Sequence, residues 1–283
     1  MTERQLITDA QNTWCPGCGN FSLEYTLRDV FNDLDKEGIP LEKIVLVTGI
    51  GCHAKMADYL DVNSFYAIHG RTIPVATGIK LARPDLTVVC CAGDGDAYAE
   101  GLDHLIFGAK RNLDITVIIH NNRVYGLTTG QYTPTSPLGF KGRSTPEGTQ
   151  ESPINPLELM LTSGATYIGR GYTKNLKTLR PLIKEAILHK GFSFVDVLQI
   201  CATYFDVHEI YDNVVYELER QETYTFEKAM KMIREWDYNG KAPIGLGTYY
   251  RKEAPTFDER IKGKRISEED REQVIQHVLE KNR

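Results

Sequence analysis

The stretch Leu86-Thr87-Val88-Val89-Cys90-Cys91-Ala92-Gly93-Asp94-Gly95 decides the fold, because a run of apolar residues leads directly into a Gly-Asp-Gly turn. A second apolar run covers residues 114–119 and is followed by Asn121-Asn122. Apolar runs of this length predict parallel strands that are buried on both faces. Since the carboxyl ends of neighbouring parallel strands meet at one edge of a sheet, we expect Asp94 and these asparagines to point into one crevice.

The chemistry of this turn suits a diphosphate cofactor. The Asp94 carboxylate and an asparagine amide oxygen are ligands that Mg²⁺ accepts, and the metal ion would hold the diphosphate. Gly93 and Gly95 would let backbone N–H groups approach the diphosphate oxygens. Gly-Asp-Gly alone is an ordinary turn, but the strands around it and their spacing favour a cofactor site. The pattern resembles the thiamine-diphosphate motif, in which Asn-Asn follows Gly-Asp-Gly one βα unit later.

The rest of the pattern alternates helices with strands, which predicts a doubly wound, mostly parallel α/β sheet between helices. Asn20 is a candidate N-cap for the first helix. Helices are expected at residues 21–34, 73–82, 99–110, 156–161 and 176–188, and further strands at 43–47 and 192–198.

Two parts of the chain lack this pattern. Residues 125–155 are rich in Gly, Pro, Thr and Ser and are too long for a simple connection, so we expect a loop that covers the cofactor. The apolar pattern thins after residue 206, and charged residues dominate from residue 251 onward. We therefore predict a cofactor-binding domain at 1–205 and a C-terminal appendage at 206–283, which is either solvated or wrapped around a partner.

Composition excludes several classes of protein. The chain has 283 residues, a net charge of −5 and 41% hydrophobic residues, which gives no basic surface for nucleic acid. No apolar stretch is long enough to span a membrane, and the polar start at residues 1–5 is unlike a secretory signal, so we expect a cytoplasmic protein. Structural disulfides are not expected there. Cys90 and Cys91 lie within a predicted strand and are expected to be inert core residues.

The other four cysteines can converge. Cys15 and Cys18 flank a Pro-Gly turn, Cys52 lies in the turn after the first predicted strand, and Cys201 follows the last one. A structural zinc site, a redox-active CxxC pair and an iron–sulfur cluster are the alternatives. A cluster is favoured by its surroundings, because an electron acceptor has a role beside a diphosphate cofactor whose intermediate is oxidised.

Taken together, these motifs resemble the β subunits of 2-oxoacid:ferredoxin oxidoreductases, and most closely those of the 2-oxoglutarate enzymes. The resemblance covers residues 13–135, with Cys201 as an outlying match. The matching segments are Trp14-Cys15-Pro16-Gly17-Cys18-Gly19-Asn20, Gly49-Ile50-Gly51-Cys52, His69-Gly70-Arg71, Gly93-Asp94-Gly95-Asp96 and Asn121-Asn122-Arg123-Val124-Tyr125-Gly126-Leu127-Thr128-Thr129-Gly130-Gln131.

The resemblance implies roles for individual residues. Cys15, Cys18, Cys52 and Cys201 would hold one 4Fe–4S cluster. Asp94, Asn122 and the backbone carbonyl of Val124 would bind Mg²⁺. Thiamine diphosphate would contact Gly51, Cys52, His53, His69, Gly93, Asp94, Gly95, Asn122, Tyr125, Gly126 and Leu127.

Two of these assignments compete with ordinary structural explanations. His69 is implied as a catalytic contact to cofactor or substrate, although a histidine at this position could simply cap the following helix. Lys55 is implied as a charge partner of the substrate, which would favour 2-oxoglutarate over pyruvate, although an isolated lysine is usually solvated. Arg71 offers a competing cation.

The implied reaction is the coenzyme A-dependent oxidative decarboxylation of a 2-oxoacid, with 2-oxoglutarate giving succinyl-CoA, or its reverse, and electrons passing to ferredoxin. Thiamine enzymes also need a glutamate from a second domain, and this chain shows one α/β unit. We therefore expect an α subunit that supplies this glutamate, in an αβ or (αβ)2 assembly. The alternatives are a non-oxidative thiamine-dependent decarboxylase or synthase subunit and a non-catalytic, zinc-stabilised binding protein.

Overall fold

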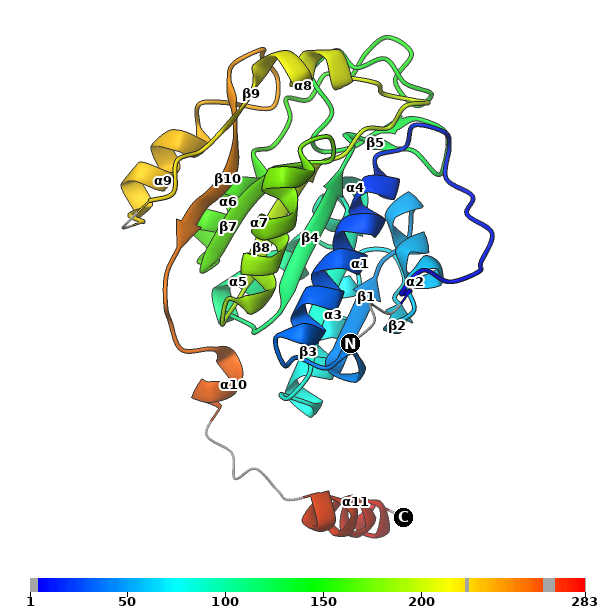
Figure 1. Cartoon of the computed structure of the whole chain (residues 1–283), viewed down its shortest axis with the longest axis vertical. Coiled ribbons are helices and arrows are strands. Elements are labelled where there is room, and N and C mark those ends of the chain that lie inside the picture. The colour runs from blue at the N-terminus through cyan, green and yellow to red at the C-terminus, as the bar shows by residue number, and fades with distance from the viewer. Residues whose placement is uncertain (1–4, 222–223, 262–267, 283) are drawn as a thin grey trace.

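Eight strands form a single twisted sheet in the computed structural model, which describes residues 5–221, 224–261 and 268–282 (Figure 1). The strand order is β2-β1-β3-β4-β8-β7-β10-β9. All neighbouring pairs from β2 to β7 are parallel, whereas β10 runs antiparallel to β7 and β9 runs parallel to β10. The strands are β1 (Ile44–Thr48), β2 (Asn63–Tyr66), β3 (Thr87–Gly93), β4 (Thr116–Asn121), β7 (Tyr167–Tyr172), β8 (Ser193–Leu198), β9 (Val215–Glu217) and β10 (Ile244–Arg251).

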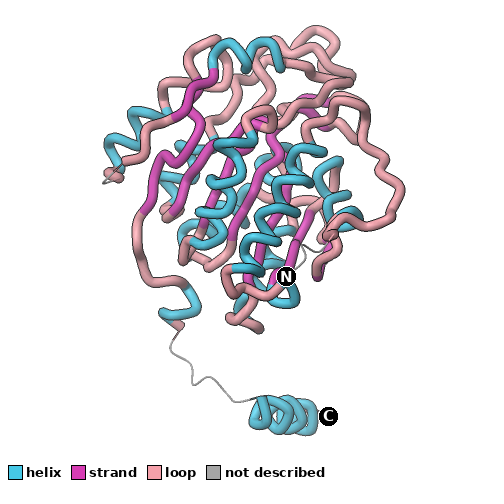
Figure 2. Tube along the Cα trace, viewed as in Figure 1, coloured by secondary structure: helices cyan, strands magenta, loops and turns pink. Residues whose placement is uncertain are grey.

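Helices cover both faces of this sheet (Figure 2). On one face lie α1 (Asn20–Lys36), α2 (Met56–Tyr59) and α7 (Leu176–Leu188), and on the other α3 (Thr72–Ala82), α5 (Leu102–Arg111), α6 (Pro156–Ser163) and α9 (Phe226–Ile233). The shorter or peripheral elements are the 3-10 turns Leu41–Lys43 and Cys52–Lys55, α4 (Asp94–Tyr98), the hairpin of β5 (Val124–Tyr125) and β6 (Gln131–Tyr132), α8 (His208–Val214), α10 (Phe257–Arg260) and α11 (Glu268–Lys281). The predicted doubly wound α/β fold is confirmed.

Alternation along the central strands produces the two cores. In β3, Val89 and Cys91 pack under α1 and α7, whereas Val88 and Cys90 pack on the opposite face. Both cysteines are fully buried, and burial raises the pKa of the Cys91 thiol to about 12. They are core residues, as predicted, because their side chains fill space between strand and helix.

The strand order locates the crevice. The chain passes from β1 to its neighbour β2 and then returns to form β3 on the other side of β1. Ligand sites of doubly wound sheets lie at such a reversal, beyond the carboxyl ends of the strands. The glycine-rich turn after β1 and the Gly93-Asp94-Gly95 turn after β3 therefore border the same opening, and the asparagines after β4 come next along the edge.

Some elements differ from the sequence-based expectation. Asn20 does not cap α1: Gly19 occupies the N-cap position, and the Asn20 side chain contacts His120 instead. The strand β7 was not predicted because Arg170 and two glycines interrupt its apolar pattern. Those glycines allow close packing, since a Cβ on Gly171 would lie 2.4 Å from Leu179 of α7.

The sheet also extends past the expected boundary at residue 205. The strand β10 pairs with β7, and β9 pairs with β10, so residues that were expected in an appendage complete one side of the sheet. The helix α9 packs on the same core as α3 and α5. Among the described residues, no helix combines the length and apolar character needed to cross a bilayer.

Asn112 fastens the chain after β10 to the end of the sheet opposite the crevice. It ends α5 in the left-handed conformation, with φ of 51°. Its Oδ1 accepts hydrogen bonds from Phe192 N and Thr166 Oγ1, both at 2.8 Å. Its Nδ2 donates to the carbonyls of Ala254 and Pro255 at 3.2 and 3.1 Å. All polar atoms of this buried amide are therefore used by the fold.

We expect Asn112→Ala to lower the free energy of unfolding by about 3 kcal/mol. The substitution leaves several buried groups without hydrogen-bond partners, and alanine is strained at positive φ. Urea unfolding followed by circular dichroism measures the change. Asn213→Ala is the matched control, since its amide donates to Glu209 O on an exposed helix. Equal losses in the two variants would contradict the anchoring role of Asn112.

Candidate functional site

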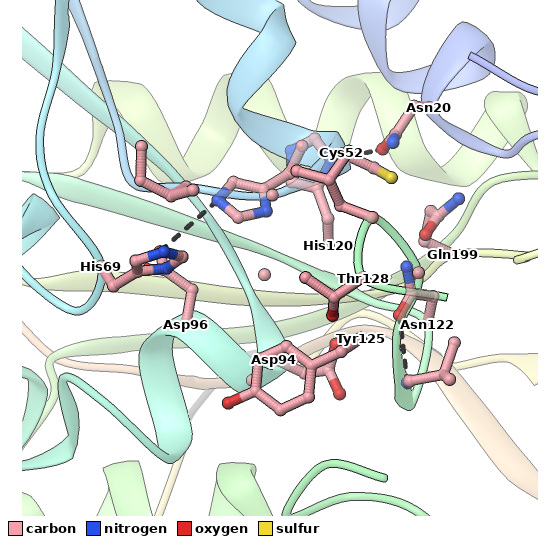
Figure 3. A pocket seen from close by; sticks show the side chains of 18 residues that line it. Asn20, Cys52, His69, Asp94, Asp96, His120, Asn122, Tyr125, Thr128 and Gln199 are labelled. Carbon is pink, nitrogen blue, oxygen red and sulfur yellow. Dashed lines mark hydrogen bonds and ion pairs between the residues drawn. The ribbon is translucent and has the colours of Figure 1, made fainter. Parts of the chain in front are cut away.

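A pocket lies at the carboxyl ends of β1, β3 and β4, and we call it the Asp94 pocket (Figure 3). It brings together every residue predicted to contact the cofactor, together with Val124. These lining residues are Gly51, Cys52, His53, His69, Gly93, Asp94, Gly95, Asn122, Val124, Tyr125, Gly126 and Leu127. Of the long loop at 125–155, only its first residues, up to Thr128, line the pocket.

Asp94 is the buried acid of this pocket. It begins α4, is 2% exposed, and its Oδ2 accepts a hydrogen bond from Thr135 Oγ1 at 2.9 Å. Burial raises the pKa of the Asp94 carboxyl to about 6, although hydrogen bonds from Thr133 and Thr135 oppose this shift. No basic side chain of the described residues lies within ion-pair distance of it. A buried carboxylate in this state suits a bound cation, which would stabilise its ionised form.

The two asparagines after β4 have different places. Asn121 turns into the core, where its Nδ2 donates to Asp196 Oδ1 at 2.9 Å and its Oδ1 accepts from Thr135 Oγ1 at 3.0 Å. Asn122 lines the pocket, and its Oδ1 accepts from Val124 N at 3.1 Å. Asp94 and Asn122 thus offer hard oxygen ligands on one cavity, which fits the chemistry of Mg²⁺.

Buried polar atoms without partners surround the same cavity. Of their residues, His53 was predicted to contact the cofactor and Asn20 was expected to cap α1. No motif marks His120 or Gln199, and Asp96 is marked only by its place in the Gly-Asp-Gly-Asp segment. Proteins seldom leave such atoms unpaired, so this wall suits a polar ligand. The atoms that lack a hydrogen bond are Asn20 Nδ2, His120 Nε2 and Gln199 Oε1, together with His53 Nε2 and Asp96 Oδ2, which make an ion-pair contact with each other only.

These polar side chains are held in pairs. His120 Nδ1 lies 2.8 Å from Asn20 Oδ1, and His53 Nε2 lies 3.4 Å from Asp96 Oδ2. Asp96 Oδ1 accepts from Gly70 N at 2.7 Å. A Cβ on Gly49 would lie 1.9 Å from Asp96 Oδ2, so the turn after β1 needs glycine there to admit the carboxylate. The glycine-rich turn therefore shapes the pocket by close approach.

A second cavity, of about 170 Å³, adjoins the first, and we call it the cysteine cavity. Cys15, Cys18, Cys52 and Cys201 all line it, so the structure brings together the four predicted ligands. The N-terminal segment is fastened over it by two hydrogen bonds. Trp14 Nε1 donates to Cys52 O at 2.7 Å, and Gly19 N donates to Ile200 O at 3.0 Å.

The thiols are separated rather than gathered at one point. Among the residues that the structure describes, no group of three or more His, Cys, Asp or Glu side chains is placed to hold a single metal ion. A mononuclear zinc site needs each sulfur within about 2.3 Å of one ion. Burial raises the pKa of the Cys18 thiol to about 11 and also raises the pKa of Cys52, where Lys55 opposes the shift. All four cysteines line this one cavity.

The two predicted catalytic residues lie on different cavities. His69 lines the Asp94 pocket, with Nδ1 3.6 Å from Glu100 Oε2. Lys55 lines the cysteine cavity, where its Nζ donates to Thr13 Oγ1 at 2.8 Å. The competing cation Arg71 donates to Glu100 O at 2.9 Å. Lys55 lines the cysteine cavity together with Cys52, but it is not among the residues that line the Asp94 pocket.

Comparison with known proteins gives the family. Residues 49–197 match the family described as thiamine pyrophosphate enzyme, C-terminal TPP binding domain. A 2-oxoacid:ferredoxin oxidoreductase subunit beta from Saccharolobus solfataricus is 40% identical over 265 residues, which covers 88% of this chain and 85% of the relative. The chain belongs to the 2-oxoacid:ferredoxin oxidoreductase β-subunit family.

Two further relatives lie on the 2-oxoglutarate side of this family. The 2-oxoglutarate synthase subunit KorB of Methanothermobacter thermautotrophicus is 38% identical over 250 residues, covering 88% of this chain and 85% of the relative. The structure of 2-oxoglutarate:ferredoxin oxidoreductase from Magnetococcus marinus with 2-oxoglutarate, coenzyme A and succinyl-CoA bound matches with a TM-score of 0.86 and 33% identity. That match covers 97% of this chain and 96% of the other. The β-subunit family to which this chain belongs is thus a family of oxidoreductases.

The raised pKa of Asp94 predicts how the stability of this chain depends on pH. The pKa is raised from 3.8 to about 6 on folding, so the folded chain binds this proton more tightly than the unfolded chain. The stability that the proton contributes is therefore lost as pH rises through about 6. In chelator at pH 7.5, Asp94→Asn should be more stable than wild type by about 1–3 kcal/mol, and the difference should vanish near pH 4. Urea unfolding at both pH values measures this.

The exposed Asp103 provides the control for this experiment, since its side chain is 72% exposed. Asp103→Asn should leave the stability nearly unchanged at both pH values. A destabilised Asp94→Asn variant at pH 7.5 would contradict the assignment of Asp94 as a strained buried acid.

Proposed function

We propose that this chain is the thiamine-diphosphate- and cluster-containing β subunit of an oxidoreductase that converts 2-oxoglutarate and coenzyme A to succinyl-CoA, or the reverse, and exchanges electrons with ferredoxin. The observation that carries this proposal is the contact between the two cavities. They share a wall made of Cys52, Asn122, Gly126, Leu127 and Gln199. A cofactor bound in the Asp94 pocket would thus lie next to an electron acceptor held by the cysteines, as oxidation of the substrate would require.

On this proposal, Asp94, Asn122 and the Val124 carbonyl hold Mg²⁺ and with it the diphosphate. Bound thiamine diphosphate supplies the electron sink for decarboxylation. Thr135 orients the Asp94 carboxylate through its hydroxyl. The unpartnered nitrogen of His120 and the amide of Asn20 offer polar contacts to the ligand on the opposite wall.

Cys15, Cys18, Cys52 and Cys201 would hold one 4Fe–4S cluster, which passes single electrons when it is bound. The common lining of one cavity by all four cysteines, directly beside the Asp94 pocket, supports this proposal. The hydrogen bond from Trp14 Nε1 to Cys52 O holds the N-terminal segment beside these cysteines.

The preference for 2-oxoglutarate is supported by the Magnetococcus marinus relative, whose structure contains 2-oxoglutarate and succinyl-CoA. His69 and Lys55 remain the proposed contacts for the substrate. Glu100 lies beside His69, and its Oε1 accepts a hydrogen bond from Tyr125 OH at 3.2 Å. This pair of contacts would orient His69 at the rim of the pocket.

A partner chain completes the proposed active site. The Asp94 pocket has a volume of about 50 Å³, below the roughly 300–1,000 Å³ of ordinary ligand sites, which agrees with a site that a second chain completes. The residues that line it include Asp94 and Asp96 but no glutamate among the described part of the chain. We propose an α subunit that supplies the catalytic glutamate in an αβ or (αβ)2 assembly, in agreement with the β-subunit names of the relatives.

Cysteine variants test the cluster. Cys52→Ser and Cys201→Ser should each reduce the EPR signal of the reduced cluster by more than about tenfold after anaerobic purification, because each removes one of four thiolate ligands. Cys90→Ser is the control and should keep the signal, since Cys90 is a buried core residue on the far side of β3. Normal iron content in Cys52→Ser and Cys201→Ser would refute the four-ligand assignment.

Asp94→Ala tests the cofactor site separately. It should abolish binding of thiamine diphosphate with Mg²⁺ in calorimetry and retain the cluster signal, because Asp94 lines one cavity and the cysteines line the other. The wild-type complex should reduce a dye with 2-oxoglutarate and coenzyme A. Decarboxylation without iron would favour the non-oxidative alternative, and stoichiometric zinc without cofactor binding would favour the binding protein.

A further inference from the structure

Arg123 has an unusual backbone and an unusual environment. It lies between the two proposed magnesium ligands Asn122 and Val124, and its φ is 62°, in the left-handed region that side-chain-bearing residues avoid. Its side chain is nevertheless 5% exposed. A strained, buried residue between two ligand positions must be held there by other contacts.

Those contacts come from elements that are distant in the sequence. Arg123 Nε donates to Thr135 O at 2.7 Å, and Nη2 donates to Tyr238 O. The guanidinium also lies over the rings of Phe205 and Trp236, at 5.7 and 5.6 Å from their centroids. No carboxylate of the described residues is within ion-pair distance of it. The charge is therefore stabilised by carbonyls and aromatic faces.

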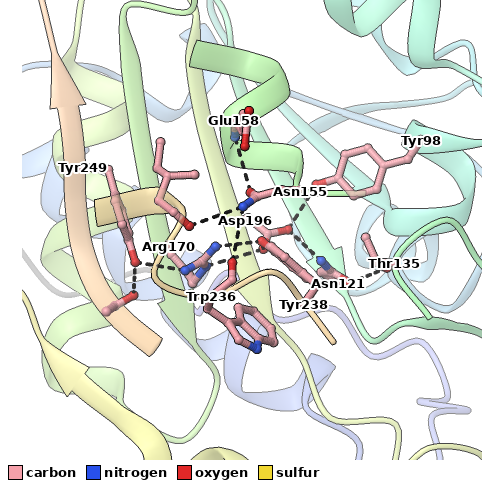
Figure 4. A network of polar contacts seen from close by, with 12 residues as sticks. Tyr98, Asn121, Thr135, Asn155, Glu158, Arg170, Asp196, Trp236, Tyr238 and Tyr249 are labelled. Carbon is pink, nitrogen blue, oxygen red and sulfur yellow. Dashed lines mark hydrogen bonds and ion pairs between the residues drawn. The ribbon is translucent and has the colours of Figure 1, made fainter. Parts of the chain in front are cut away.

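Residues 236–238, which contact Arg123, are also connected to the Asp94 pocket by a second series of hydrogen bonds (Figure 4). Tyr238 OH donates to Asp196 Oδ2 at 2.6 Å, and Asp196 Oδ1 accepts from Asn121 Nδ2 at 2.9 Å. Thr135 Oγ1 then lies between Asn121 and Asp94. The residues around Tyr238 thus contact both sides of the proposed metal site, through Arg123 and through Asp196.

We infer that Arg123 is a positioning residue that locks the Asn122-Arg123-Val124 turn in its ligand-bearing conformation by anchoring it to residues 236–238. The anchor acts on the backbone: it compensates for the left-handed φ and so fixes the Asn122 side chain and the Val124 carbonyl. It does not contact the ligand, and its charge is not what the ligand recognises. The inference rests on the proposed thiamine-diphosphate site and assigns to the C-terminal region a role in cofactor binding.

Three substitutions separate this role from a charge effect. Arg123→Ala removes the anchor and keeps the strain, so it should raise the Mg²⁺ concentration needed for half-maximal thiamine-diphosphate binding by about tenfold. Arg123→Gly also removes the anchor but accepts the left-handed φ, so it should stay within about threefold of wild type. Arg123→Lys keeps the positive charge but lacks the planar guanidinium group that makes two hydrogen bonds. It should therefore bind thiamine diphosphate more weakly than Arg123→Gly.

The measurement is calorimetric titration of thiamine diphosphate at several Mg²⁺ concentrations, with the full chain and whatever subunit co-purifies with it. Arg220→Ala is the control, because it removes the same charge from a side chain that is 75% exposed. Fluorescence of Trp236 gives a second readout, since the Arg123 guanidinium faces its ring. It should change in all three Arg123 variants and not in Arg220→Ala.

The outcomes are distinguishable. Weaker binding in Arg123→Ala and Arg123→Lys with near-normal binding in Arg123→Gly supports the anchor. Equal losses in Arg123→Ala and Arg123→Gly with normal binding in Arg123→Lys would overturn it in favour of a charge effect. Unchanged binding in all three variants would overturn it as well, because Arg123 would then have no effect on the site. If Arg123→Ala does not fold, the relative affinities of Arg123→Gly and Arg123→Lys for thiamine diphosphate decide the same question. Failure of wild type to bind thiamine diphosphate would overturn the proposed function, and this inference with it.

Discussion

The buried carboxylate of Asp196 is the interaction on which the arrangement of the site depends. It lies in β8 with no exposed surface, and it accepts hydrogen bonds from Tyr98, Asn121 and Tyr238. Burial raises the pKa of Asp196, and Arg170, with Nε 4.0 Å away, opposes that shift. Since α4, β4, β7 and the C-terminal region each supply one of these groups, a single carboxylate fixes the relative positions of four elements. Removing one partner would leave a buried polar group unpaired, so the network is held as a unit.

Asp94 shows the cost of preparing such a site. Its carboxylate is buried beside Asp196, which also raises its pKa, and its hydrogen bonds come from neutral hydroxyls. In this environment, the ionised form is disfavoured until a cation arrives. An arginine paired with Asp94 would stabilise the ionised carboxylate but would compete with the proposed Mg²⁺ ion. The fold thus keeps its basic residues elsewhere: the buried Arg170 faces Asp196, and Arg123 faces carbonyls and rings.

The parts of this site that the sequence predicts are those encoded by local pattern. The apolar runs before Asp94 and Asn122 predict two parallel strands, and parallel strands alone require that their carboxyl ends meet. The role of Asp196 could not be predicted in this way. A single acidic residue in an apolar strand shows no local pattern, and its hydrogen-bond partner Tyr238 lies 42 residues away in the sequence. Asn20 was misjudged for the same reason. Its type and position suit a helix cap, and only the three-dimensional contact with His120 directs it into the pocket.

The same limit applies to the C-terminal region. Its sequence is polar and interrupted, and yet Trp236 and Tyr238 are almost fully buried. They belong to a small core cluster with aliphatic residues such as Leu198 and Leu246, and the guanidinium groups of Arg123 and Arg170 also lie over their rings. Hydrophobic periodicity detects burial against aliphatic cores and misses burial against cations and hydroxyls. A region whose sequence predicts an appendage therefore forms part of the support for the Asp94 pocket, through Tyr238 and Asp196. The wall between the two cavities is thin. A Cβ on Gly126 would lie only 3.4 Å from Cys201 Sγ and 3.7 Å from Cys52 Sγ. A displacement of the turn that precedes Gly126 would alter the Asp94 pocket and the cysteine cavity together.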